Sequence, residues 1–134
     1  MRVWHKDLIE VLPREQLVAQ WRELSAMASN IKTKGTPNHI LVNKVMNYSL
    51  DHFISYAYYI RTEMTLRGYR TMETVWQKIV SVKPDYVIVP FNELYKDWHE
   101  TRYLRQCYFN LEEKYDCGGI GEEVFQKIRE RFVF

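Results

Sequence analysis

The stretch from residue 12 to residue 31 repeats apolar residues at the period of an α-helix. The repeating positions, separated by four or three residues, are Leu17, Trp21, Leu24, Ala28 and Ile31. This spacing places them on one stripe of an amphipathic helix. Pro13 suits the first turn of that helix, because a backbone N–H has no helical partner there. We therefore expect a helix from about Pro13 to about Ser29 that packs its stripe into a core.

A second face of the same helix is polar and adjoins the apolar stripe. It carries Gln16, Gln20 and Glu23, again separated by four and then three residues. At the flank of a buried stripe, the Glu23 carboxylate can be partly removed from water. The pattern alone favours an ordinary solvated charge at this position, because most glutamates are exposed.

The remaining apolar spacing predicts further helices. We expect a second helix capped by Ser49 and stopped by Gly68, and a third capped by Thr71. The residues between Pro84 and Pro90 predict an extended, buried connector. Two more helices are marked by Leu104, Cys107, Tyr108, Leu111 and Tyr115, and then by Val124, Phe125, Ile128 and Phe132. The prediction is an all-α fold: residues 1–134 form a single compact domain of about five helices, packed around an N-terminal arm that Trp4 and Leu8 help to anchor.

Length and composition restrict the class of protein. A chain of 134 residues with 46% hydrophobic and 27% charged residues is typical of one soluble domain. No window approaches 18 consecutive apolar residues, so we expect no membrane partner. Met1 is followed by charge rather than by the apolar run of a signal peptide, so we expect a cytoplasmic protein.

Few residues suggest a metal or a cofactor. The two cysteines, Cys107 and Cys117, are too few for a disulfide framework, and Cys107 falls on an apolar stripe. The four histidines lie in separate segments without the spacing of metal ligands. Glycine-rich phosphate loops and the usual hydrolase motifs are absent. We therefore expect neither a metal nor a cofactor.

The charge is distributed unevenly along the chain. Residues 1–70 carry ten Lys and Arg against six Asp and Glu, whereas residues 71–134 carry nine against eleven. Between Glu23 and Asp51 there is no acidic residue, and Lys32, Lys34 and Lys44 all lie in this interval. A basic stretch without opposing carboxylates suits the phosphate backbone of a nucleic acid.

The run Leu12-x-x-x-Gln16-Leu17-x-Ala19-x-Trp21-Arg22-Glu23-Leu24 resembles the first helix of the pyrimidine-dimer DNA glycosylases of the phage endonuclease V type. The stretch from Asn43 to Arg67-Gly68-Tyr69 resembles that family's second long helix. The opening MRVWHKDLIEVLPR is similar to a bacterial branch of these enzymes. The resemblance covers about residues 1–70.

The resemblance implies a DNA repair glycosylase with abasic-site lyase activity, acting as a monomer on double-stranded DNA that carries pyrimidine-dimer damage. Its implied nucleophile is the α-amino group, here that of Met1, since a residue as large as Arg2 normally leaves the initiator methionine in place. An α-amine ionises near pH 7.7–8.0 in general, against about 10.4 for lysine, so more of it is nucleophilic at neutral pH. Glu23 matches the catalytic carboxylate of the family, and Arg22 matches an arginine used around the lesion phosphates. With Arg2, Lys32, Lys34 and Lys44, Arg22 completes the expected DNA-binding set.

Two alternatives remain open at the level of sequence. The same scaffold can be a DNA-binding domain without catalysis, which predicts salt-dependent binding but no imine. It can also be a helical interaction or small-molecule protein unrelated to DNA. The distance between the Met1 amine and Glu23 separates this last class from the other two.

Overall fold

The computed structural model describes residues 1–132, and this part of the chain is entirely helical and loop, without strands. Its α-helices are α1 (Arg14–Lys34), α2 (Leu50–Leu66), α3 (Glu73–Val80), α4 (Thr101–Asp116) and α5 (Glu122–Arg131). Three short 3-10 helices join them, η1 (Lys6–Val11), η2 (Asn43–Asn47) and η3 (Phe91–Glu93). The predicted all-α fold is confirmed.

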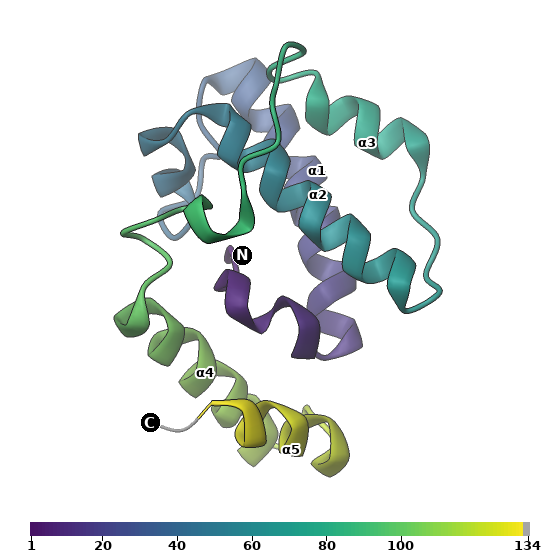
Figure 1. Cartoon of the computed structure of the whole chain (residues 1–134), viewed down its shortest axis with the longest axis vertical. Helices are drawn as coiled ribbons and strands as arrows, with labels where there is room; N and C mark the ends of the chain where they lie inside the picture. The colour runs from purple at the N-terminus through teal and green to yellow at the C-terminus, as the bar shows by residue number, and fades with distance from the viewer. Residues whose placement is uncertain (133–134) are drawn as a thin grey trace.

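The helices surround the beginning of the chain. α1 packs against α2 and α3, while α5 packs against α4 and against η1. Figure 1 shows the N-terminus near the middle of the molecule, with α1 and α2 on one side and α4 and α5 on the other. Val3, Trp4, Leu8, Ile9 and Leu12 are buried. The anchored N-terminal arm that the sequence predicted is therefore part of the core.

Helix α1 buries the predicted stripe and extends five residues beyond the predicted end. Leu17, Trp21, Leu24, Ala28 and Ile31 are all buried, and so is Met27. No glycine or proline interrupts residues 30–34, and Ile31 continues the stripe, so the helix runs to Lys34. It ends at Gly35, which adopts the left-handed conformation with φ of 78° and donates its N–H to the Ile31 carbonyl.

The predicted limits of α2 are close to those observed. The Ser49 hydroxyl accepts a hydrogen bond from the Asp51 N–H and so caps the first turn. Gly68 has a φ of 82°, and the Tyr69 N–H returns to the Met64 carbonyl at 2.8 Å. These are the contacts of a glycine-terminated helix, as the sequence indicated.

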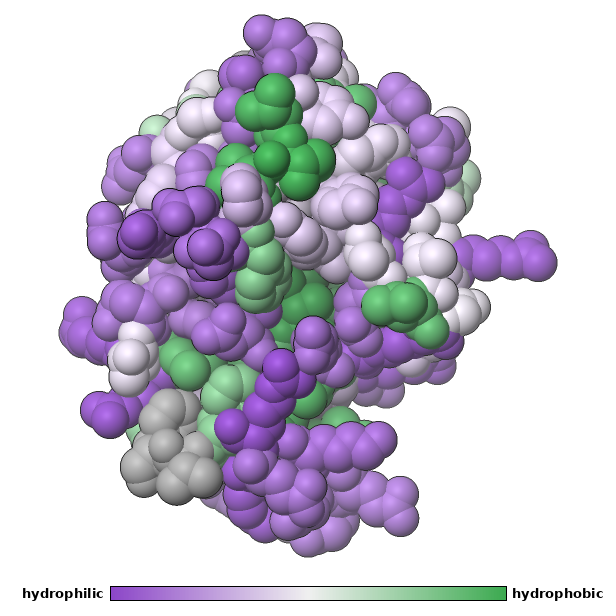
Figure 2. Space-filling model, in the orientation of Figure 1, coloured by the Kyte–Doolittle hydropathy of each residue, from purple (hydrophilic) through white to green (hydrophobic). Residues whose placement is uncertain are grey.

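Two predictions in the middle of the chain are wrong. Thr71 does not cap α3, because its hydroxyl accepts a hydrogen bond from Arg61 Nε at 2.9 Å, and Met72 occupies the cap position. The connector between Pro84 and Pro90 is extended but not buried: Val87 is 64% exposed and Ile88 40% exposed. Figure 2 shows the apolar surface that this connector leaves on the outside. Side chains of α2 hold its backbone in place, since Asp51 and Ser55 accept from the Val87 and Val89 N–H groups.

Candidate active site

The first residues of the chain are held by one buried glutamine of α1. The Gln20 side chain is fully buried and accepts the Trp4 N–H at 2.9 Å while donating to the Arg2 carbonyl at 2.9 Å. Its two amide atoms thus bind the backbone on both sides of Val3, as a neighbouring strand would. Because α1 is rigid, this pairing fixes the path of residues 2–4.

Three further side chains hold the arm from other helices. Tyr56 of α2 donates to the Trp4 carbonyl at 2.7 Å, and Tyr103 of α4 donates to the Val3 carbonyl at 2.5 Å. Burial raises the pKa of both tyrosines, so both phenols remain protonated donors at neutral pH. His99 accepts the Lys6 N–H at 3.0 Å on its Nδ1 atom. The arm is therefore fixed from α1, α2, α4 and the segment that leads into α4.

This path brings the start of the chain to Glu23. The Arg2 N–H lies 3.4 Å from Glu23 Oε2, and Arg2 is the residue directly after the terminal amine. Met1 is 41% exposed, so its surroundings are open to a ligand. Gln20 and Glu23 are three residues apart on one helical face, so the contact that positions the arm and the carboxylate beside it belong to the same rigid element.

Met1 and Glu23 line an open depression of about 510 Å³, which we call the cleft. Its walls come from the arm, from α1, from the loop after α1 and from α4, through Met1, Arg2, Trp4, Glu15, Gln16, Ala19, Arg22, Glu23, Leu41, Asn110 and Lys114. Its side-chain cations are Arg2, Arg22 and Lys114. The Arg2 guanidinium lies 5.5 Å from the centre of the Trp4 ring and donates to the Cys107 sulfur at 3.8 Å. A terminal amine and a carboxylate thus share an open cleft with three cations.

The structure separates the predicted site residues into two groups. It brings Met1, Arg2, Arg22 and Glu23 together at the cleft. The three lysines of the acid-free stretch do not line it. Lys32 and Lys34 lie at the far end of α1, about 13–17 Å along the axis from Glu23, and Lys44 lies on η2. Lys32 donates to the Ser81 hydroxyl at 3.1 Å.

Sequence reasoning missed the contribution of α4 to the cleft. Asn110 and Lys114 are four residues apart, so they share one face of that helix, which adjoins the face of the buried Cys107 and Leu111. The helical period could have shown that they share a face, but not that this face lies opposite Glu23. Gln16 was noted only for its helical face; its Oε1 atom is buried and has no hydrogen-bond partner within residues 1–132.

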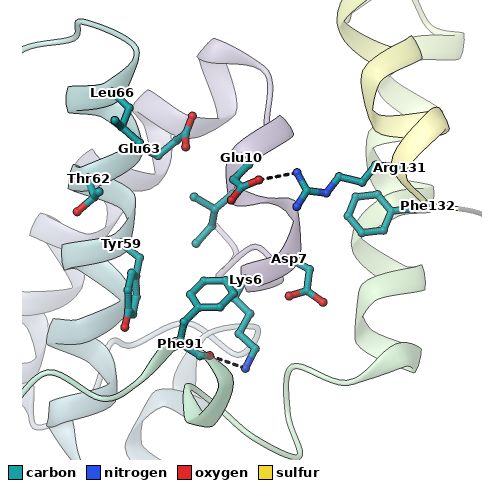
Figure 3. Close-up of a pocket in the computed structure, with 11 residues that line it drawn as sticks. Lys6, Asp7, Glu10, Tyr59, Thr62, Glu63, Leu66, Phe91, Arg131 and Phe132 are labelled. Carbon is teal, nitrogen blue, oxygen red and sulfur yellow. Dashed lines mark hydrogen bonds and ion pairs between the residues drawn. The ribbon is translucent and has the colours of Figure 1, made fainter.

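Another pocket lies between η1, α2 and the end of α5 (Figure 3) and has a volume of about 370 Å³. Its charged groups are largely satisfied within the protein. The Lys6 amine donates to the carbonyls of Phe91 and Leu94 at 2.9 and 2.8 Å, and Glu10 pairs with Arg131 at 2.6 Å. The pocket contains no open nucleophile beside a carboxylate, so the cleft is the better candidate for an active site.

No group of three or more His, Cys, Asp or Glu side chains in residues 1–132 is arranged to hold a metal ion. Within the same residues, no helix combines the length and apolar character needed to cross a bilayer.

The fold and the cleft define a helical protein whose first residues lie beside a carboxylate of α1. Residues 1–77 match the family model described as pyrimidine dimer DNA glycosylase, which is more than half of the chain. The chain belongs to this family. The match covers the arm, α1, α2 and most of α3, whereas α4 and α5 lie outside it. No curated protein and no solved structure matches the chain.

Proposed function

We propose that this protein is a DNA repair glycosylase with abasic-site lyase activity, with the Met1 amine as nucleophile and Glu23 as the catalytic carboxylate. Membership of the family supports action on pyrimidine-dimer damage in DNA. The observation that carries the mechanism is the 3.4 Å contact between the Arg2 N–H and Glu23 Oε2, inside a cleft that also exposes Met1. A group within one residue of this contact can reach the same sugar as the carboxylate.

The proposed chemistry needs only groups that line the cleft. The neutral amine attacks C1′ of a damaged nucleotide and displaces the base, which takes up a proton as it leaves; the C1′–O4′ bond of the sugar then opens, O4′ takes up a proton and the nitrogen loses one, which gives an imine. At an abasic aldehyde the same imine forms with loss of water. The imine acidifies the C2′ proton, and removal of that proton expels the 3′ phosphate and breaks the strand. Glu23 stabilises the positive charge that develops on the sugar and moves these protons. Hydrolysis of the imine then returns the free amine.

The cations of the cleft suit the substrate. Arg2 and Arg22, together with Lys114 of α4, would face the phosphates on either side of the extruded nucleotide. Extrusion costs a few kcal/mol and is least costly at a damaged step. Because α4 supplies two lining residues and Tyr103 holds the arm, we propose that residues 78–132 complete one glycosylase domain with residues 1–77. The remaining two residues of the expected domain, 133–134, lie outside the described part of the chain. We further propose a cytoplasmic monomer.

Borohydride trapping tests this function. The parent protein, incubated with duplex DNA containing an abasic site and then reduced, should give a covalent adduct whose peptide link maps to Met1. Glu23→Gln should lower the rate of strand cleavage by about 10²–10⁴-fold, the usual contribution of a positioned acid or base. Glu15→Gln, on the same wall of the cleft, is the matched control and should cleave at nearly the parent rate. Absence of an adduct from the parent, or parental cleavage by Glu23→Gln, contradicts the proposal.

A second function rests on the acid-free interval with Lys32, Lys34 and Lys44. These lysines lie away from the cleft and support DNA binding without catalysis on the same scaffold. In that case replacing them would weaken DNA binding and reduce its dependence on salt, while the parent protein would form no imine. The trapping experiment therefore separates the two functions.

A further inference from the structure

The surface beyond the cleft continues through two neighbouring grooves. A small groove of about 190 Å³, the α1 groove, is lined by Arg14, Glu15, Val18 and Arg22. It shares Glu15 and Arg22 with the cleft. A larger groove of about 350 Å³, the Tyr69 groove, is lined by Glu10, Val11, Leu12, Pro13, Arg14, Arg67, Tyr69, Val124 and Lys127. Arg14 belongs to both, so the three depressions form one continuous path along and around the start of α1.

The charges left open on this path are mostly positive. The Arg67 guanidinium is occupied by hydrogen bonds within the protein, because it donates to Glu63 at 2.7 Å and to the carbonyls of Ile9, Glu10 and Leu12. The Glu10 carboxylate is paired with Arg131 at 2.6 Å. Glu15 is the remaining acid of the α1 and Tyr69 grooves, and the cleft adds Glu23. The same grooves carry three exposed cations, Arg14, Arg22 and Lys127, for which residues 1–132 provide no ion pair.

Arg14 is held in place rather than extended freely into water. Its guanidinium lies 5.4 Å from the centre of the Tyr69 ring, which orders the side chain at the junction of the two grooves. Lys127 comes from α5 and faces the same groove from the other side. Two helices far apart in the sequence thus present cations to one depression, which suits a ligand with repeated negative charges.

We propose that the α1 and Tyr69 grooves bind the phosphate backbone of the duplex that flanks the lesion, through Arg14 and Lys127. This proposal rests on one part of the proposed function, namely that duplex DNA occupies the cleft. Arg14 lies nine residues before Glu23, about 13 Å along α1. At 3.4 Å per base pair, this reach corresponds to about four base pairs from the lesion. The contact is made on one side of the lesion only.

Binding to trimmed duplexes tests this proposal. The probe is a duplex with a stable tetrahydrofuran abasic analogue and ten base pairs on each side, compared with duplexes cut to two base pairs on one side or the other. Dissociation constants are measured between 0.05 and 0.2 M salt for the parent, Arg14→Gln and Lys127→Gln. Lys78→Gln on α3, which lines none of the three depressions, is the control.

On the long duplex, each of the two substitutions should lower the slope of log K against log salt by about 0.9 and weaken binding by up to about eightfold at 0.1 M salt. Lys78→Gln should match the parent. On one of the two trimmed duplexes the parent should bind more weakly than on the long duplex. On that duplex Arg14→Gln and Lys127→Gln should bind as the parent does. Lys127 lies outside α1, so its variant tests the proposal even if Arg14→Gln destabilises the fold.

Several outcomes overturn the proposal, and they are distinct from failure of the proposed function. If both variants bind the long duplex with the parent's slope, no flanking contact exists, whether or not the parent forms a borohydride adduct. If both keep their deficit on both trimmed duplexes, the cations act elsewhere. If the parent binds as expected but forms no adduct, the flanking contact stands and the catalytic function fails. If the parent does not bind DNA, both fail.

Discussion

Gln20 is the residue on which the geometry of the cleft depends most. Its amide binds the backbone of Arg2 and Trp4 at the same time, and it is fully buried. Removing it leaves a donor and an acceptor of the arm without partners in the core. Such groups cost free energy because water cannot replace the lost bonds. An amide at this position therefore stabilises both the fold and the approach of the terminus to Glu23.

Gln20→Met keeps the size of the side chain and removes its hydrogen bonds. We expect the free energy of unfolding in urea to fall by about 2–4 kcal/mol, since each unpaired buried group costs about 1–3 kcal/mol. The control is Gln77→Met, because Gln77 is exposed on α3 and its side chain bonds to the exposed Glu73; it should change stability by less than about 0.5 kcal/mol. Equal losses in the two variants would show that the arm does not depend on Gln20.

The sequence predicted half of this arrangement. The spacing of Gln16, Gln20 and Glu23 correctly placed them on one polar face of the first helix. It could not show that Gln20 is buried, because its partners are backbone atoms of the arm, and the conformation of the arm is set by distant residues such as Tyr56 and Tyr103. Side-chain patterns contain no information on which backbone atoms a buried amide will meet.

At the level of elements, the segment that leads into α4 supports the arm through a buried histidine. His99 is 6% exposed and lies against His5, with ring centres 5.0 Å apart. Burial, and then the positive charges of His5 and Lys6, lower the pKa of His99 from 6.5 to about 2. The ring is neutral at pH 7 and can accept the Lys6 N–H. Burial also lowers the pKa of His5.

A pH dependence of stability follows from the lowered pKa of His99. Below about pH 6.5 the unfolded chain binds a proton at this histidine that the folded chain excludes, so stability is lost as the pH falls through this value. Between pH 6 and pH 4 His99 should contribute a slope of about 1 kcal/mol per pH unit to the free energy of unfolding. His99→Gln, which retains an acceptor for Lys6, should flatten the measured slope by that amount. An unchanged slope would assign the acid sensitivity to other groups.

Element boundaries were predictable where local chemistry determined them. Ser49 and Gly68 delimit α2 through contacts within a few residues, and the sequence indicated both. Thr71 failed as a cap because Arg61, ten residues earlier, takes its hydroxyl. The 84–90 connector was expected to be buried because several of its residues are apolar. It lies at the surface, where side chains of α2 bind its backbone, and local sequence does not show these distant contacts.

At the scale of the whole molecule, the two cysteines report on different parts of the fold. Cys107 belongs to α4 and is buried on the side that contacts Arg2 of the arm, and burial raises the pKa of its thiol. Cys117 is exposed just after α4. A thiol reagent should therefore label one cysteine per folded chain quickly and both in urea, because the thiolate is the reactive form. Mass spectrometry of labelled peptides checks the assignment. Rapid labelling of Cys107 in the folded protein would mean that the arm and α4 separate readily.

The cleft itself could be predicted only in part. Met1, Arg2, Arg22 and Glu23 were expected at one site and line it together. The opposite wall, with Asn110 and Lys114, comes from the part of the chain that the family model does not match. Its position depends on how α4 and α5 pack against the arm and η1. Contacts of this kind, between residues about a hundred positions apart, cannot be derived from the periodicity of either segment.

The hydrogen bonds of Gln20 also affect how the molecule moves. Gln20, which binds the arm through two hydrogen bonds, and Glu23 lie about one helical turn apart on the same rigid helix, α1. Relative motion of the arm and the Glu23 carboxylate therefore requires a bend in α1 or the loss of the Gln20 hydrogen bonds. Tyr103 and Cys107 attach the same arm to α4, so a displacement of α4 would strain this attachment as well.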